Sequence, residues 1–66
     1  MLLNGKLYSL ETLKEKNLLS LLNSLEINPS TIAIEKNGDI IPREDWEKTE
    51  LMADDELELI KFVGGG

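Results

Sequence analysis

The pair Asn-Gly occurs twice in this chain, each time between two short apolar runs, and this feature restricts the possible folds most. Asn4-Gly5 separates MLL from KLYSL, and Asn37-Gly38 separates TIAIEK from DII. Asparagine and glycine tolerate the positive φ angles of a type I′ turn, whose twist matches that of a two-stranded hairpin. We therefore predict two β-hairpins, one with strands near Met1–Asn4 and Lys6–Leu10, the other around Ile32–Ile41.

A leucine-rich segment lies between the two predicted hairpins. Its spacing is that of one stripe of an amphipathic helix, occupied by Leu18, Leu21, Leu22 and Leu25. Asn17 is a suitable N-cap, and Asn28-Pro29 should close the segment because the residue before a proline is disfavoured in the helical region. We predict a helix over Asn17–Glu26 whose leucines face the core.

The segment ELELIKFV predicts a final strand over Glu56–Val63. The polar segment before it contains Trp46, which we expect to be at least partly buried because an exposed indole is unfavourable on a small protein. The predicted order is two strands, a helix and three strands. This order favours the α+β class, with one mixed sheet of about five strands and the helix packed across one face. The right-handed crossover rule places the later strands beside the first.

Apolar side chains emerge on both faces of the final strand. Leu57 and Leu59 share one face, whereas Ile60 and Phe62 share the other. A single helix can cover only one face of a sheet. Either Ile60 and Phe62 form an exposed docking patch for a partner, or a loop folds back over them.

Sixty-six residues, 41% of them hydrophobic, suffice for one compact domain. We expect that domain to span residues 1–63, with a flexible glycine tail at 64–66. The chain lacks cysteine, an apolar run of membrane-spanning length and a readable signal peptide, so we expect a cytoplasmic protein without a membrane partner.

The net charge is −6, and acidic residues are concentrated near the C-terminus. Eight of them lie within fifteen positions, with Lys48 as the only basic residue among them: Glu44, Asp45, Glu47, Glu50, Asp54, Asp55, Glu56 and Glu58. Nucleic acid is excluded as a partner because phosphate binding requires clustered Lys and Arg. The acidity either keeps a small protein soluble or attracts a protein with a basic surface.

The residue inventory excludes most catalytic sites. The chain has neither His nor Cys, so the Ser-His and Cys-His nucleophile systems and the usual zinc sites are absent. Asp54–Glu56 lacks the spacing of a calcium loop, and we expect it to be a solvated turn. We predict no metal site, no bound cofactor and no catalytic residue, and hence a protein that is not an enzyme.

The remaining candidate group is the α-carboxylate of Gly66. A tail of Gly64, Gly65 and Gly66 lacks side chains and could enter a narrow channel, and three residues span about 10 Å when extended. A carboxylate that attacks the α-phosphorus of ATP forms an acyl adenylate, from which a sulfur nucleophile can displace AMP. Otherwise, the glycines are simply a frayed end.

The chain resembles the thiamine-biosynthesis sulfur carriers of the ThiS type, which have the β-grasp, ubiquitin-like fold. The residues that carry the resemblance are the helix NLLSLLNSL, the segment PREDW at Pro42–Trp46, the strand ELELIKFV and the glycine end. The family ends in two glycines, so Gly64 is an addition to its pattern.

The resemblance implies a sulfur carrier that serves as a protein co-substrate. An E1-like enzyme adenylates the terminal glycine with ATP and magnesium, and sulfur from a donor protein converts it to a thiocarboxylate. Thiazole synthase then takes the sulfur into the thiazole ring of thiamine. On this chain the modified residue is Gly66. Two alternatives are a carrier of the molybdopterin-synthase small-subunit type and a β-grasp binding module with an inert tail.

Overall fold

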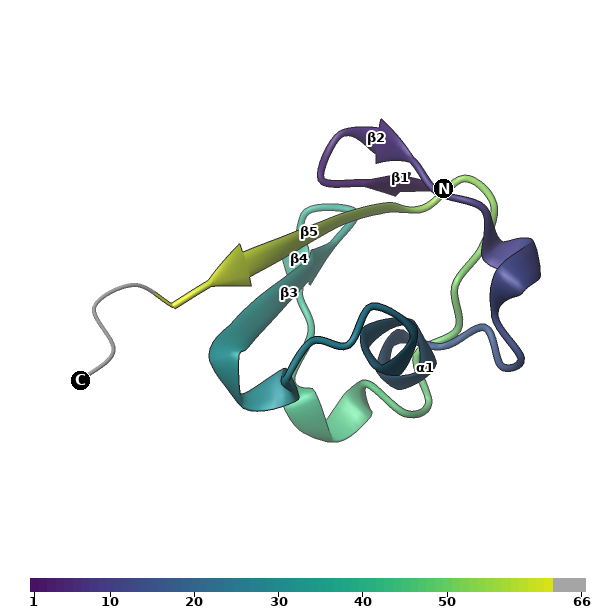
Figure 1. Cartoon of the computed structure of the whole chain (residues 1–66). Helices are drawn as coiled ribbons and strands as arrows, with labels where there is room; N and C mark the ends of the chain where they lie inside the picture. The colour runs from purple at the N-terminus through teal and green to yellow at the C-terminus, as the bar shows by residue number, and fades with distance from the viewer. Residues whose placement is uncertain (63–66) are drawn as a thin grey trace.

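The computed structural model describes residues 1–62, which form one five-stranded mixed sheet and one α-helix (Figure 1). Three short 3-10 helices complete this part of the chain, at Leu10–Thr12, Pro29–Thr31 and Arg43–Asp45. The strands and the α-helix are β1 (Leu2–Leu3), β2 (Lys6–Leu7), α1 (Leu18–Ser24), β3 (Ile32–Lys36), β4 (Asp39–Ile40) and β5 (Glu56–Lys61). The predicted domain boundary at residue 63 and the predicted tail at 64–66 lie outside the described residues.

The strand order is β2-β1-β5-β3-β4, so the last strand lies at the centre of the sheet. β5 runs parallel to β1 and antiparallel to β3. The prediction that a later strand would lie beside the first is confirmed. A helix packed across one face of such a sheet gives the β-grasp fold, which was also predicted.

Both Asn-Gly hairpins form as predicted. The φ angles are 50° at Asn4 and 81° at Gly5, and 52° at Asn37 and 91° at Gly38, which is the pair of positive angles of a type I′ turn. The first hairpin is shorter than predicted, since β2 ends at Leu7. The chain then turns into the 3-10 helix Leu10–Thr12, whose first turn is capped by the Ser9 hydroxyl accepting from the Glu11 N–H.

Helix α1 begins after the predicted cap and ends before the predicted end. The Asn17 Oδ1 accepts a hydrogen bond from the Ser20 N–H at 2.8 Å. At the other end, Glu26 has a φ of 58°, and the Ile27 N–H donates to the Leu22 carbonyl at 3.0 Å. This is a Schellman motif with glutamate at the position usually taken by glycine. The helix therefore ends at Ser24, before proline becomes relevant.

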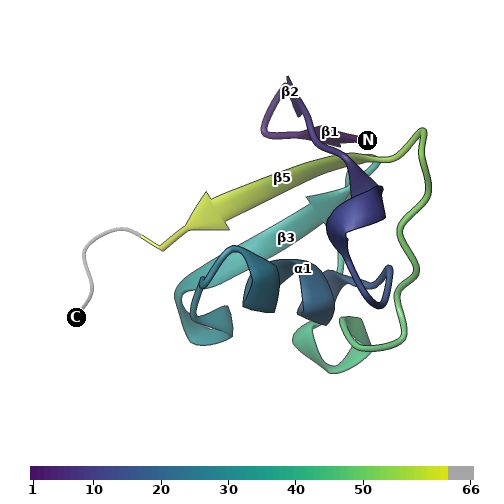
Figure 2. The same ribbon diagram turned by 45° about the vertical axis from the view of Figure 1, so that its right-hand side comes forward.

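Helix α1 lies across one face of the sheet (Figure 2). The hydrophobic core fills the space between them. Its buried side chains come from the helix, the central strands and the long connections: Leu13, Leu18, Leu21, Leu22, Ile32, Ile34, Trp46, Leu51 and Leu57. No helix within residues 1–62 is long and apolar enough to cross a membrane.

Candidate functional site

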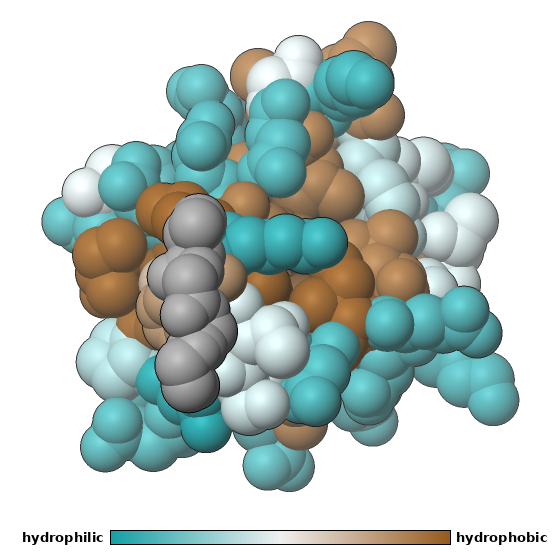
Figure 3. All heavy atoms as spheres, turned by 60° about the vertical axis from the view of Figure 1, so that its left-hand side comes forward, coloured by the Kyte–Doolittle hydropathy of each residue, from teal (hydrophilic) through white to brown (hydrophobic). Residues whose placement is uncertain are grey.

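The sheet face opposite α1 is open near the end of β5. Ile60 is 43% exposed and Phe62 is 61% exposed, so no loop within residues 1–62 covers them. Of the two arrangements that the sequence allowed, the structure has the exposed patch. Figure 3 shows hydrophobic side chains gathered at this end of the molecule.

Strand register determines which residues neighbour this patch. Ile60 lies opposite Ala33, and Glu58 lies opposite Glu35 in the antiparallel β3–β5 pair. On the other side of β3, Glu35 lies opposite Ile40, which is 60% exposed. On the open face, the adjacent glutamates Glu35 and Glu58 are thus followed, toward the end of β5, by the apolar patch of Ile60 and Phe62.

The backbone at the end of β5 is held on both sides. The Phe62 N–H donates to the Thr31 carbonyl at 3.1 Å, next to the β3 pairing. On the β1 side, the Asn4 Oδ1 accepts from the Leu59 N–H at 2.7 Å, where β1 itself has already ended. These contacts fix the position of the strand that leads to the glycines. Gly64, Gly65 and Gly66, the predicted tail, lie outside the described residues.

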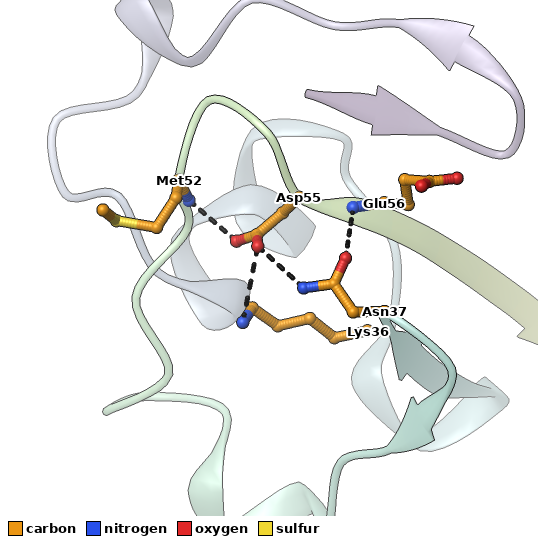
Figure 4. A network of polar contacts seen from close by, with 5 residues as sticks. All are labelled: Lys36, Asn37, Met52, Asp55 and Glu56. Carbon is orange, nitrogen blue, oxygen red and sulfur yellow. Dashed lines mark hydrogen bonds and ion pairs between the residues drawn. The ribbon is translucent and has the colours of Figure 1, made fainter.

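The acidic residues between positions 44 and 58 do not all lie on the surface, because Asp55 is buried. The prediction of a solvated turn at Asp54–Glu56 is therefore wrong for Asp55. Asp54 and Glu56 are exposed, whereas Asp55 is only 5% exposed. Its Oδ2 accepts from the Met52 N–H at 2.8 Å, and its Oδ1 accepts from the Asn37 Nδ2 at 2.9 Å (Figure 4). Asp55 is therefore a structural residue and not part of a solvated turn.

Asp55 connects the β3–β4 turn to the start of β5. The Asn37 Oδ1 accepts from the Glu56 N–H at 2.9 Å, and the Lys36 Nζ lies 3.6 Å from the Asp55 Oδ1. Burial by itself would raise the pKa of the Asp55 carboxyl. The hydrogen bonds from Asn37 and the Met52 N–H, together with the charge of Lys36, outweigh burial and hold this pKa below its ordinary value of 3.8.

The PREDW segment is structural. Pro42 precedes the 3-10 helix Arg43–Asp45, which turns Trp46 into the core at 2% exposure. The Trp46 Nε1–H donates to the Ile41 carbonyl at 2.8 Å, and the Arg43 guanidinium lies 5.9 Å from the centroid of the indole ring. The prediction that Trp46 is buried is confirmed.

Sequence reasoning did not identify Glu35 as part of the acidic face, because it lies outside the segment rich in acid. The alternation of buried and exposed residues in IAIEK places Glu35 on the face opposite Ile32 and Ile34, a signal available in the sequence. Only the pairing with β5 brings Glu35 next to Glu58. Among residues 1–62, no group of three or more acidic side chains is arranged to hold a metal ion.

Comparison with known proteins identifies relatives of the whole chain. The family model described as the ThiS family matches residues 1–66. The crystal structure of thiamine biosynthesis protein ThiS from Geobacter metallireducens superposes with a TM-score of 0.82 at 29% identity, over 98% of this chain and 96% of that one.

Two curated relatives extend the comparison. The sulfur carrier protein ThiS of Bacillus subtilis is 37% identical over 46 residues, which are 70% of this chain and 70% of that protein. A thiazole synthase of Paramagnetospirillum magneticum is 32% identical over 47 residues, 71% of this chain but only 14% of that protein. From the match along its full length and the shared fold, the chain belongs to the ThiS family of sulfur carrier proteins.

Proposed function

We propose that this protein carries sulfur, as a thiocarboxylate on Gly66, to the enzyme that forms the thiazole ring of thiamine. The observation that carries the proposal is the family match, which extends through the glycines to residue 66. The protein acts as a co-substrate, and its partners supply the catalytic groups.

The proposed reaction has two activation steps. The Gly66 carboxylate attacks the α-phosphorus of ATP, which forms an acyl adenylate and releases pyrophosphate. An E1-like enzyme binds the ATP and magnesium. A persulfide of a donor protein then attacks the acyl carbon, and AMP leaves as an acyl disulfide forms. A thiolate next attacks the donor's sulfur in that disulfide, so that a new disulfide forms with the donor and the thiocarboxylate leaves. Glycine suits this role because an end without side chains can enter a narrow channel in the partner.

Thiazole synthase is the proposed acceptor of the sulfur. The similarity to a short part of a protein named thiazole synthase supports this partner, because a carrier-like segment then occurs in the same polypeptide as the enzyme. Ordering three glycines costs on the order of 3–6 kcal/mol, so the folded domain has to supply the affinity. We propose that Ile60 and Phe62 do so, since they are exposed beside the residues that lead to the tail.

The test is the intact mass of the protein after incubation with the adenylating enzyme, ATP and a sulfur donor. A mass gain equal to the exchange of one oxygen for one sulfur, lost when Gly66 is deleted, would support the carrier role. A folded protein that stays unchanged, beside a control carrier that is converted, would refute it and leave a binding module with an inert tail. Delivery of the sulfur to thiazole synthase, and not to the large subunit of molybdopterin synthase, separates the two carrier types.

Docking is tested separately. We expect Ile60→Ser to raise the concentration of carrier needed for half-maximal conversion. Met52→Ser is the matched control, because Met52 is 56% exposed but lies in the loop before β5. Equal effects of the two substitutions would show that the patch around Ile60 has no special role.

A further inference from the structure

A hollow of about 400 Å³ lies on the open face between the two hairpin turns. Gly5 and Gly38 contribute to its edge, one from each Asn-Gly turn. Three glutamates belong to its lining: Glu35, Glu56 and Glu58. The hollow is therefore acidic. Ile60, part of the apolar patch that the proposed function uses, follows Glu58 by two positions on the same face of β5.

Within residues 1–62, the three glutamates of this hollow form no ion pair with a lysine or an arginine. Glu35 and Glu58 lie directly opposite each other in the β3–β5 pair, and Glu56 is two residues before Glu58 on the same face. The ion pairs within residues 1–62 involve Asp55 and Asp45, and none involves these three glutamates. Like charges directly opposite each other destabilise a sheet. Folding alone gives no reason for this arrangement.

Charge complementarity restricts what can bind here. Nucleic acid is repelled, and a metal ion does not find a suitable group of ligands among residues 1–62. A guanidinium group fits better, because its planar fork donates to two carboxylates at once and its aliphatic stem tolerates an apolar border. A protein surface with an arginine beside an apolar side chain matches both parts of the open face.

We propose that the adenylating partner inserts an arginine into this hollow and packs an apolar side chain against Ile60, so that attraction by Glu35 and Glu58 accelerates docking. The proposal rests on the proposed function, because it assigns the chemistry of the partner surface that brings the tail into the enzyme. Attraction between opposite surface charges mainly raises the association rate, and salt weakens it.

The test measures association of the carrier with the purified adenylating enzyme from the same genome, at low and at physiological ionic strength. We expect the double variant E35Q/E58Q to associate about 3–10-fold more slowly at low salt and to show a weaker salt dependence. The control is E26Q, which removes a charge from the exposed residue that follows α1, on the opposite side of the sheet. It should keep the wild-type rate.

Two further measurements make the result decisive. The thermal midpoint of E35Q/E58Q should equal or exceed that of the wild type, because the substitutions relieve repulsion; a lower midpoint would contradict the premise. At saturating carrier concentration, the double variant should still be converted to the thiocarboxylate. Wild-type association rate and salt dependence in E35Q/E58Q would overturn this inference and leave the carrier role intact. Failure of the wild type itself to be converted would overturn both.

Discussion

The buried carboxylate of Asp55 leads to a quantitative prediction about stability. Replacing Asp55 by alanine removes the acceptor of two hydrogen bonds, from the Met52 N–H at 2.8 Å and from the Asn37 Nδ2 at 2.9 Å. It also removes the partner of Lys36. Hydrogen bonds to a charged group each contribute about 1.5–3 kcal/mol, and part of this is offset because the carboxylate no longer has to be buried.

We therefore expect Asp55→Ala to lower the free energy of unfolding by about 2–4 kcal/mol. A domain of this length has a total of roughly 3–10 kcal/mol, so the loss is a large fraction of its stability. The corresponding fall in the thermal midpoint is on the order of 10–25 °C. Urea unfolding followed by the fluorescence of Trp46, the single tryptophan of the chain, measures the change.

The neighbouring aspartate supplies a matched control. Asp54 is exposed, and its replacement by alanine should change the free energy of unfolding by less than about 0.5 kcal/mol. If Asp55→Ala and Asp54→Ala unfold at the same urea concentration, the contacts of Asp55 with Asn37 and Met52 do not stabilise the fold, and the reasoning is refuted.

Three further predictions concern the same framework. Because the folded-state pKa of Asp55 lies below its ordinary value of 3.8, the stability that its carboxylate contributes is present above 3.8 and is lost as the pH falls from 3.8 through the folded-state pKa. Stability should fall less steeply over this range in Asp55→Asn, and equal slopes would contradict this. Trp46→Phe removes the donor to the Ile41 carbonyl and should lower the free energy of unfolding by about 1–2 kcal/mol. Urea unfolding followed by circular dichroism measures this change, and an unchanged urea midpoint would show that this bond is dispensable. Asn4→Ala should lower the free energy of unfolding by about 1–3 kcal/mol. It removes the acceptor of the Leu59 N–H, and alanine tolerates the φ of 50° at this position less well than asparagine does. Hydrogen exchange of the Leu59 amide measures this change, and unaltered protection would count against it.

The elements that sequence reasoning predicted well are those decided by local chemistry. The Asn-Gly turns follow from the tolerance of these two residues for positive φ, and the start of α1 follows from the capping side chain of Asn17. The extent of each element was less predictable. Helix α1 ends at Ser24 because Glu26 adopts a left-handed conformation that its side chain does not favour, and packing of the residues around it has to stabilise that turn.

The sequence by itself determined the two hairpins, the amphipathic helix, the order of elements and the resemblance to a family, which rests on the leucine-rich helix, PREDW, the final strand and the glycine end together. Only the tertiary structure decided which acidic residues act together. Asp55 is buried because it meets donors from Asn37 and Lys36, 18 and 19 positions away, while Glu35 joins Glu58 because β3 pairs with β5. The sequence shows how many carboxylates the chain has. Whether each of them is a buried acceptor or part of an exposed surface depends on strand pairing, which is a property of the whole chain.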